Sequence, residues 1–200
     1  MAFSLAAGLT AGAVFDQDNV VRGGAVETIR LINYKDIYPD GVVTLDGTDK
    51  QRVTAITLQT GIKQAWKYEG FNRSMRPKYE LVKAAFSVGY IHTIDFVVFQ
   101  IDYATKMELT AMAMGKIVAV VQNLDTNDDN PYEVYGLDAG MELITNVRDI
   151  NDADSNGAFV LQLATNPDGA KEGHMPMTWF ITNLATTTTA VEVLDVATGA

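Results

Sequence analysis

Oxygen-bearing side chains gather in Asp152-Ala-Asp154-Ser-Asn156-Gly157, whose spacing matches the opening of an EF-hand calcium loop. Such a loop supplies a bidentate glutamate at its twelfth position, because calcium takes roughly six to eight oxygen ligands. The twelfth position here is Leu163, inside an apolar run. We therefore interpret the motif as an acidic turn with Gly157 at a positive φ. Calcium binding by Asp152, Asp154 and Asn156 is the alternative.

Residues for nucleophilic catalysis are few. The chain has two histidines, His92 and His174, and the serines nearest to His92 in sequence are Ser74 and Ser87. The sequence contains no Gly-x-Ser-x-Gly elbow, P-loop, dinucleotide-binding glycine motif or His-Glu-x-x-His. Paired carboxylates for glycoside cleavage stay open in a chain with 25 acidic residues. We predict that the chain is not an enzyme and uses no cofactor.

The composition restricts the kinds of molecule that this chain is expected to bind. A formal net charge of −10 and an isoelectric point near 4.5 disfavour non-specific binding to nucleic acid or to anionic membranes. The absence of cysteine excludes disulfides, cysteine-ligated metals and thiol nucleophiles. No run reaches the roughly 18 apolar residues of a membrane span. The hydrophobic share of 48% suits a folded domain with a real core.

The N-terminus differs from the rest of the chain. Met1 to Phe15 is mostly apolar and carries no charge before Asp16, yet it lacks the basic start of a secretory signal. We expect residues 1–24 to form an arm that packs on a neighbouring subunit. Residues 25–200 are then a single β-rich domain.

Strand signals dominate that domain. Runs rich in β-branched and aromatic residues predict nine or ten strands, with Tyr79–Ser87 and Tyr90–Ile101 as an antiparallel pair turning at Val88-Gly89. The other main predicted strands are Val26–Asn33, Val53–Thr60, Lys116–Gln122, Tyr132–Tyr135, Ala158–Leu163, Met177–Thr182 and Val191–Leu194, with Thr186–Thr189 as a hairpin loop. The pattern predicts a mainly β fold, a β-sandwich or partly open barrel flanked by one principal α-helix.

That helix is predicted at Ala104–Met114. Asp102 is a good N-cap, and Gly115 suits the position after the last turn. Met107, Ala111 and Met114 recur at helical spacing, so we expect them to pack on the sheet. A methionine-rich stripe can also be a binding face for a partner.

Charge is segregated along the chain. Basic residues cluster between Lys63 and Lys83, whereas residues 125–154 are acidic with Arg148 as the one base. These are solvated loops or complementary faces between identical subunits. For the second interpretation, the candidate inter-subunit residues are Arg73, Arg76, Lys78, Asp125, Asp128 and Asp129.

The order of segments resembles structural proteins of tailed bacteriophages, above all the tail tube subunits. The likeness covers roughly Arg22 to Phe180: an arm, strands, a strand–helix–strand unit at Ile91–Gln122, and three later phrases. These phrases are Tyr132-Glu-Val-Tyr-Gly-Leu-Asp-Ala-Gly-Met141, Gly157-Ala-Phe-Val-Leu-Gln-Leu163 and Glu172-Gly-His-Met-Pro-Met-Thr-Trp-Phe180.

The resemblance implies a virion protein, assembled in the host cytoplasm, whose six-fold rings stack around a lumen with inner sheets joined edge to edge. Its partners would be copies of itself and other virion proteins, with DNA passing through but not specifically bound. Two alternatives stay open. One is a capsid-decorating or head–tail connector protein. The other is a carbohydrate-binding or adhesive β-sandwich, which would need an exposed aromatic cluster, for example from Tyr132, Tyr135 and Trp179.

Overall fold

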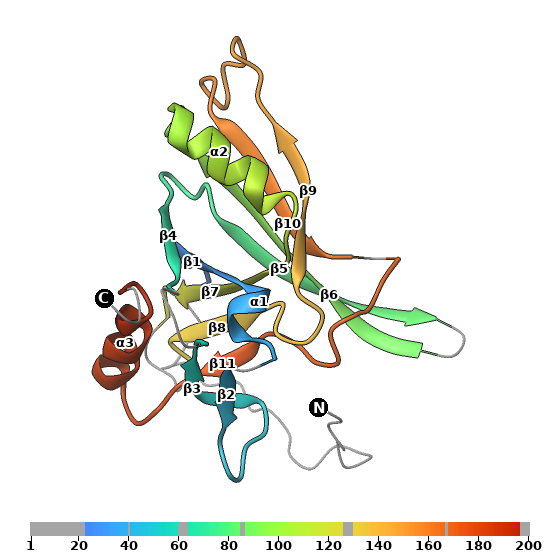
Figure 1. Cartoon of the computed structure of the whole chain (residues 1–200), viewed down its shortest axis with the longest axis vertical. Coiled ribbons are helices and arrows are strands. Elements are labelled where there is room, and N and C mark those ends of the chain that lie inside the picture. Colours follow the sequence, from blue (N-terminus) through green and yellow to red (C-terminus); the bar gives the residue numbers. More distant parts are fainter. Residues whose placement is uncertain are drawn as a thin grey trace.

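The computed structural model describes residues 23–39, 41–59, 64–84, 87–125, 130–166 and 168–196, and the expected arm at 1–24 lies almost wholly outside them. Eleven strands and three helices make up the described chain (Figure 1). The strands are β1 Ala25–Asn33, β2 Val42–Leu45, β3 Arg52–Thr57, β4 Trp66–Glu69, β5 Arg76–Ala84, β6 Ser87–Val98, β7 Ile117–Asn123, β8 Tyr132–Tyr135, β9 Met141–Val147, β10 Phe159–Thr165 and β11 Met177–Trp179. The helices are α1 Tyr34–Ile37, α2 Tyr103–Met112 and α3 Leu184–Val193. The predicted mainly β fold is confirmed.

The strands form one folded sheet in the order β2-β3-β11-β8-β7-β9-β10-β6-β5, with β1 paired to β7 and β4 to β1. Among the described strands, β3 and β11 are the one pair that runs parallel. The path turns sharply between β7 and β9, which share the single residue pair Ile117 and Met141. The strands β9, β10, β6 and β5 therefore form a four-stranded antiparallel limb that folds back over β1 and β7.

Two hydrophobic cores flank the central layer. In β7, Ala119 and Val121 belong to the first core, which the four-stranded limb and α2 cover. Val118 and Val120 belong to the second core, which β3, β8, β11 and α3 cover. Alternate side chains of a strand point to opposite faces, so a nearly continuous apolar run is the sequence of a strand covered on both sides.

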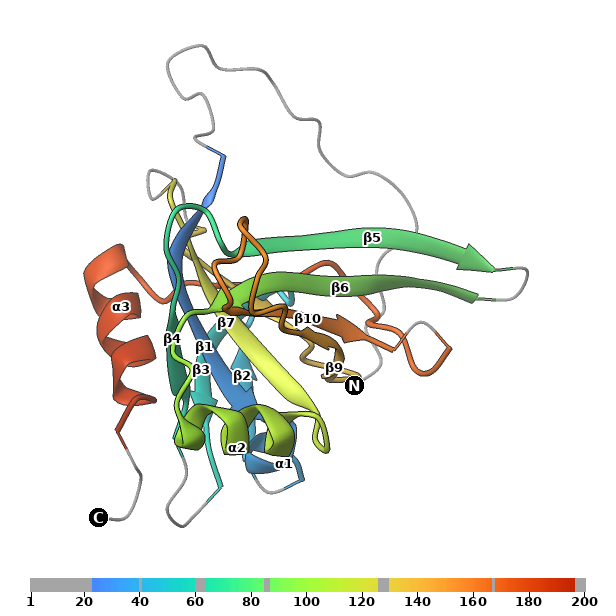
Figure 2. The same cartoon turned by 90° about the horizontal axis from the view of Figure 1, so that it is seen from above.

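The β5–β6 hairpin extends beyond the rest of the sheet (Figure 2). Here β6 pairs with β10 only between Thr93 and Val98, whereas it pairs with β5 from Ser87 to Asp95. The predicted turn at Val88-Gly89 is wrong, because Gly89 pairs with Val82 and Val88 with Lys83 inside the ladder.

The C-terminal segment is also a correction. Residues 184–193 form helix α3, not the predicted hairpin loop and strand. The Asn183 side chain accepts a hydrogen bond from the Thr186 amide at 2.8 Å and caps the helix. Thr187, Val191 and Leu194 are buried at helical spacing against the second core. This packing outweighs the weak helix propensity of β-branched residues.

Helix α2 begins as predicted, with the Asp102 carboxylate accepting from the Thr105 amide at 2.8 Å. Its buried face is wrong in the prediction, since Thr105, Leu109 and Met112 are the buried residues. Met107 and Met114 are 56% and 89% exposed. These two methionines are therefore not buried against the sheet. No helix in the described ranges is long and apolar enough to cross a membrane.

Candidate functional site

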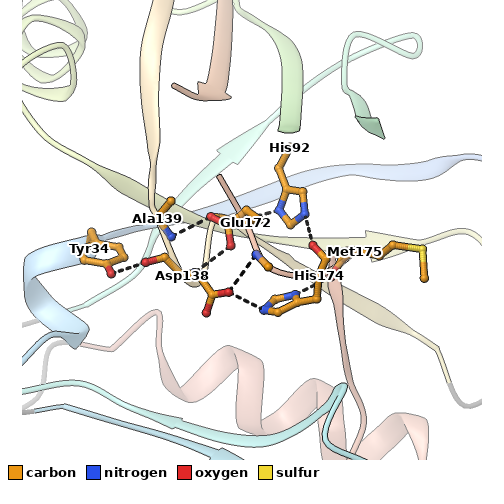
Figure 3. Close-up of polar contacts among 9 residues, drawn as sticks. Tyr34, His92, Asp138, Ala139, Glu172, His174 and Met175 are labelled. Atoms are coloured by element: carbon orange, nitrogen blue, oxygen red, sulfur yellow. Dashed lines mark hydrogen bonds and ion pairs between the residues drawn. The ribbon is translucent and has the colours of Figure 1, made fainter. Parts of the chain in front are cut away.

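The densest group of buried titratable side chains lies where three segments meet (Figure 3). His92 comes from β6, Asp138 from the loop between β8 and β9, and Glu172 and His174 from the segment between β10 and β11. His92, Glu172 and His174 are buried, and Asp138 is partly buried. We call these four residues the loop cluster.

The β8–β9 loop is shaped by glycine. Gly136 and Gly140 have φ angles of +73° and +76°, in the left-handed region that disfavours other residues. A Cβ atom on Gly136 would lie 2.8 Å from the Met141 side chain and 3.0 Å from the Ile117 carbonyl oxygen. The tight loop turns the Asp138 and Ala139 amides toward Glu172.

Glu172 holds that loop. Its carboxylate accepts hydrogen bonds from the Asp138 amide at 2.8 Å and the Ala139 amide at 2.9 Å. Its own backbone pairs with Tyr90 of β6 in both directions, at 2.9 and 3.1 Å. Burial raises the pKa of Glu172, and the two amides only partly oppose this.

His174 and Asp138 form the second link. His174 Nε2 lies 3.1 Å from Asp138 Oδ2, and His174 Nδ1 lies 2.7 Å from the Met175 carbonyl oxygen. Because Nδ1 faces a carbonyl, it carries a proton, so a proton on Nε2 toward Asp138 makes the ring an imidazolium. Burial alone would lower the pKa of His174, but the hydrogen bonds to Asp138 and Met175 raise it above its ordinary value.

The imidazole ring of His92 is neutral, in contrast to that of His174. Its Nδ1 accepts from the Gly136 amide at 3.1 Å, and its Nε2 lies 3.0 Å from the His174 carbonyl oxygen, to which it donates. This is the neutral tautomer with the proton on Nε2. Burial lowers the pKa of His92 to about 4. Both ring nitrogens bind backbone groups, so His92 is not placed to act as a general base.

The loop cluster could be a metal site or a structural contact between loops. Asp138, Glu172 and His174 each offer a ligand atom, all within 4.8 Å of one another, which is a ligand set of the type that divalent metals accept. The same atoms already join loops within the chain, since both Glu172 oxygens bind amides and Asp138 Oδ2 also accepts from the Gly173 amide at 3.2 Å. We therefore interpret the loop cluster as a structural contact, here called the latch, which joins the limb to the layer formed by β1, β7 and β8.

The serines named with His92 do not complete a catalytic group. Ser74 Oγ accepts from the Phe71 amide at 2.9 Å and lies 3.3 Å from Glu27, in the loop between β4 and β5. The side chain of Ser87 lies outside the described part of the structure. The hydroxyl that does reach the loop cluster is Tyr34, which donates to the Asp138 carbonyl oxygen at 2.6 Å.

The calcium candidate folds as an acidic turn. The Asp152 carboxylate accepts from the Ser155 amide at 3.0 Å, and Asn156 and Gly157 have φ angles of +51° and +75°. Leu163, at the position where calcium would need a glutamate, is fully buried in β10. The turn interpretation, with Gly157 at a positive φ, is confirmed.

The inter-subunit candidates occupy several places. Arg76 and Lys78 lie on β5, and the Lys78 ammonium is 2.9 Å from Asp95 Oδ2 of the same chain. Arg73 lies in the loop before β5, where its amide donates to Glu27. Asp125 follows β7, next to Leu124, which lines a groove together with Arg73, Arg76 and Lys78. Asp128 and Asp129 lie outside the described residues.

The aromatic residues named for carbohydrate binding are brought together but buried. Trp179 of β11 pairs with Tyr132 of β8, and both are 1% exposed. Tyr135 is buried in the first core. These three rings therefore do not form an exposed sugar-binding platform.

Comparison with known proteins adds no family. No protein-family model, no curated protein and no solved structure matches this chain. Function must therefore be argued from geometry. Sequence reasoning noted both histidines but missed Asp138 and Glu172, which lie 34 residues apart and meet only in the fold.

Proposed function

We propose that this chain is a structural subunit of a phage virion, which assembles with copies of itself into stacked rings forming the tube through which DNA passes. The observation that carries the proposal is the four-stranded limb, whose two outer strands each have an edge that no other described strand covers along most of its length. Exposed strand edges are an aggregation hazard in a monomer, but a ring pairs every edge with that of a neighbour.

The free edges are long. Among the described strands, β5 pairs with β6 alone over nine residues, Arg76 to Ala84. β9 pairs with β10, and its other side meets β7 only at Met141. Within the described ranges, β9 from Glu142 to Val147 therefore has a strand neighbour on one side only. Pro77 is tolerated in β5 because proline is compatible with edge strands.

Strand direction supports closure into a ring. All three pairings within the limb are antiparallel. With four alternating strands, β5 and β9 run in opposite directions. In a ring, rotation preserves strand direction along the axis, so β5 of one copy would meet β9 of the next in antiparallel orientation.

Charge also differs between the two edges. β5 presents Arg76, Lys78 and Lys83, whereas β9 carries Glu142 and leads into the acidic turn containing Asp149 and Asp152. Exposed pairs contribute only about 0.2–1 kcal/mol each, so their role would be steering and register. The net charge of −10 fits a conduit that does not retain DNA.

The test is assembly seen by negative-stain electron microscopy of the concentrated protein. Wild type should form hollow tubes. Val147→Lys on β9 should reduce them, because lysine on an edge strand opposes edge pairing. Val42→Lys is the matched control, since Val42 lies on β2, an edge strand outside the limb, and is 55% exposed against 54% for Val147.

The outcomes separate the candidates. A wild-type protein that stays monomeric at high concentration would overturn the proposal. Trimers or monomers that bind only to capsid shells would support the decorating-protein alternative. Equal loss of tubes in both lysine variants would show that the limb edge has no special role.

A further inference from the structure

An apolar groove of about 720 Å³ lies beside α2, at the end of the sheet where β1 stops. Its apolar lining comes from β1, β4, the end of α2 and the residues just after α2, and includes Leu31, Trp66, Tyr68, Ala111, Met112 and Met114. The strands β1 and β4 pair here through Leu31 and Trp66, so the floor of the groove is rigid sheet.

The groove is bordered by large apolar side chains in contact with water. Trp66 is 46% exposed and Met114 is 89% exposed. Met107 lies on the same face of α2, about two helical turns before Met114. Methionine side chains adapt to irregular apolar ligands, which makes such a face suited to binding a flexible segment. An exposed cluster of this type indicates an interaction surface.

The sequence of the chain offers a matching ligand. Residues 1–15 are mostly apolar and uncharged, and they precede the described part of the chain. They contain Phe3, Leu5, Leu9, Val14 and Phe15, whose burial would gain about 25 cal/mol per Å² of apolar surface. The segment brings no charged side chain that would have to be desolvated in the groove.

Geometry favours a second copy as the source of this segment. The described chain begins at Gly23, at the start of β1, whereas the groove is lined by residues at the other end of β1, in α1 and in α2. The first residues of β1 and the helices α1 and α2 lie at opposite ends of this strand (Figure 2). The nine residues of β1 separate these points by about 26 Å. A link from Phe15 to Ala25 spans at most about 35 Å, so reaching its own groove would take most of that length.

We propose that the groove beside α2 binds the N-terminal segment, residues 1–15, of another copy of this chain. The proposal rests on the proposed self-assembly and names one of its contacts. Because the segment leaves at one end of β1 and the groove lies at the other, a head-to-tail contact between two copies would bring the segment of one copy to the groove of the next. The strand β1 runs across β5 and β6 (Figure 2), so this contact and the edge-to-edge contact of the limbs would use different surfaces.

The absence of native cysteine allows a direct test with the full chain. One batch carries Ala7→Cys or Ala11→Cys in the N-terminal segment, and a second carries Ala111→Cys in the groove. After mixing and mild oxidation, a disulfide between the two batches requires Cα atoms within about 7 Å. Ala185→Cys on α3 is the matched control, since Ala111 and Ala185 are both exposed alanines on helices.

We expect the mixed dimer to form in about tenfold higher yield with Ala111→Cys than with Ala185→Cys. Met114→Glu, a change at a surface position, should lower that yield in the Ala111→Cys batch without lowering its melting temperature. Tubes without this cross-link would overturn the docking proposal and leave the proposed function standing. A cross-link without tubes would support docking and overturn the tube.

A double variant tests whether the groove binds the N-terminal segment of its own chain instead. If Ala7→Cys and Ala111→Cys in one chain give only an intramolecular disulfide, and the mixed batches give none, the groove binds its own N-terminal segment. That result overturns the proposal. If neither tubes nor any cross-link form, both the docking proposal and the tube proposal fail.

Discussion

Lowering the pH from about 7 to about 5 should destabilise the fold through His92, which the structure holds neutral and buried. Its imidazole ring accepts from the Gly136 amide and donates to the His174 carbonyl oxygen, so no lone pair is left for a proton. The pKa of His92 is about 4 in the fold against 6.5 for an unperturbed histidine, chiefly because burial disfavours the charged ring.

The sign follows from proton uptake. The unfolded chain binds a proton at His92 as the pH falls through 6.5, while the folded chain does so only near 4. Stability is therefore fully present above 6.5 and is lost between these values. Integrating the two titrations gives a loss of about 2 kcal/mol from pH 7 to pH 5.

His174 provides the matched comparison, because the chain has only these two histidines. Burial alone would lower the pKa of His174, but its contacts with Asp138 and Met175 raise it. A raised pKa stabilises the fold fully below 6.5, and this contribution is lost as the pH rises through the folded value. The two rings should therefore shift stability with pH in opposite directions.

Urea denaturation of wild type, His92→Gln and His174→Gln between about pH 5 and about pH 9 is the assay. His92→Gln keeps a donor for the His174 carbonyl oxygen and should flatten the loss of stability toward pH 5. His174→Gln should cost more stability at pH 6 than at pH 9. If the two variants change the pH dependence with the same sign, the assignment of one neutral and one charged ring is refuted.

Three other substitutions test the packing by urea denaturation. Glu172→Gln should lower the free energy of unfolding by about 2–4 kcal/mol, because the side-chain amide group would face two backbone donors. The control Glu80→Gln changes an exposed residue and should be nearly neutral. Equal losses in the two variants would refute the latch. Leu109→Ala should lower the free energy of unfolding by about 2–5 kcal/mol, whereas Met107→Ala should change it by no more than about 0.5 kcal/mol. The reverse order would show that the predicted methionine face is the buried one. Asp102→Ala should cost about 1 kcal/mol through loss of the helix cap, and no change would show that the cap is unimportant.

Local patterns predicted the strands best where burial is on both faces or the run is bounded by turn residues. The strand at Tyr132–Tyr135 is found with the expected bounds, and the apolar run after α2 forms β7. Asp102 caps α2 because its carboxylate needs only the neighbouring amides. Such features depend on residues within a few positions of one another.

The buried face of α2 could not be chosen from the sequence. Thr105, Leu109 and Met112 have the same helical spacing as Met107, Ala111 and Met114, and similar apolar character. Only the position of the sheet decides which set is covered. Helix α3 illustrates the same limit, since its threonines favour strands locally and its packing on the second core decides otherwise.

The loop cluster was hidden for a different reason. A buried carboxylate is stabilised by amides that only the fold brings to it, as for Glu172 and the Asp138 and Ala139 amides. Two glycines with positive φ create that loop, but the sequence does not state what the loop encloses. Such a contact has no local signal.

The edges of the limb are likewise non-local, and they carry the functional argument. An edge strand is defined by the neighbour it lacks, which its own sequence does not record. The strand β9 was not predicted from the sequence. In the fold, β5 from the basic stretch and β9 from the acidic stretch lie on opposite sides of one antiparallel limb. Two edges with opposite direction and unlike charge fit each other better than either fits itself. This favours a head-to-tail contact over a two-fold dimer, and a head-to-tail contact either closes into a ring or continues as a filament.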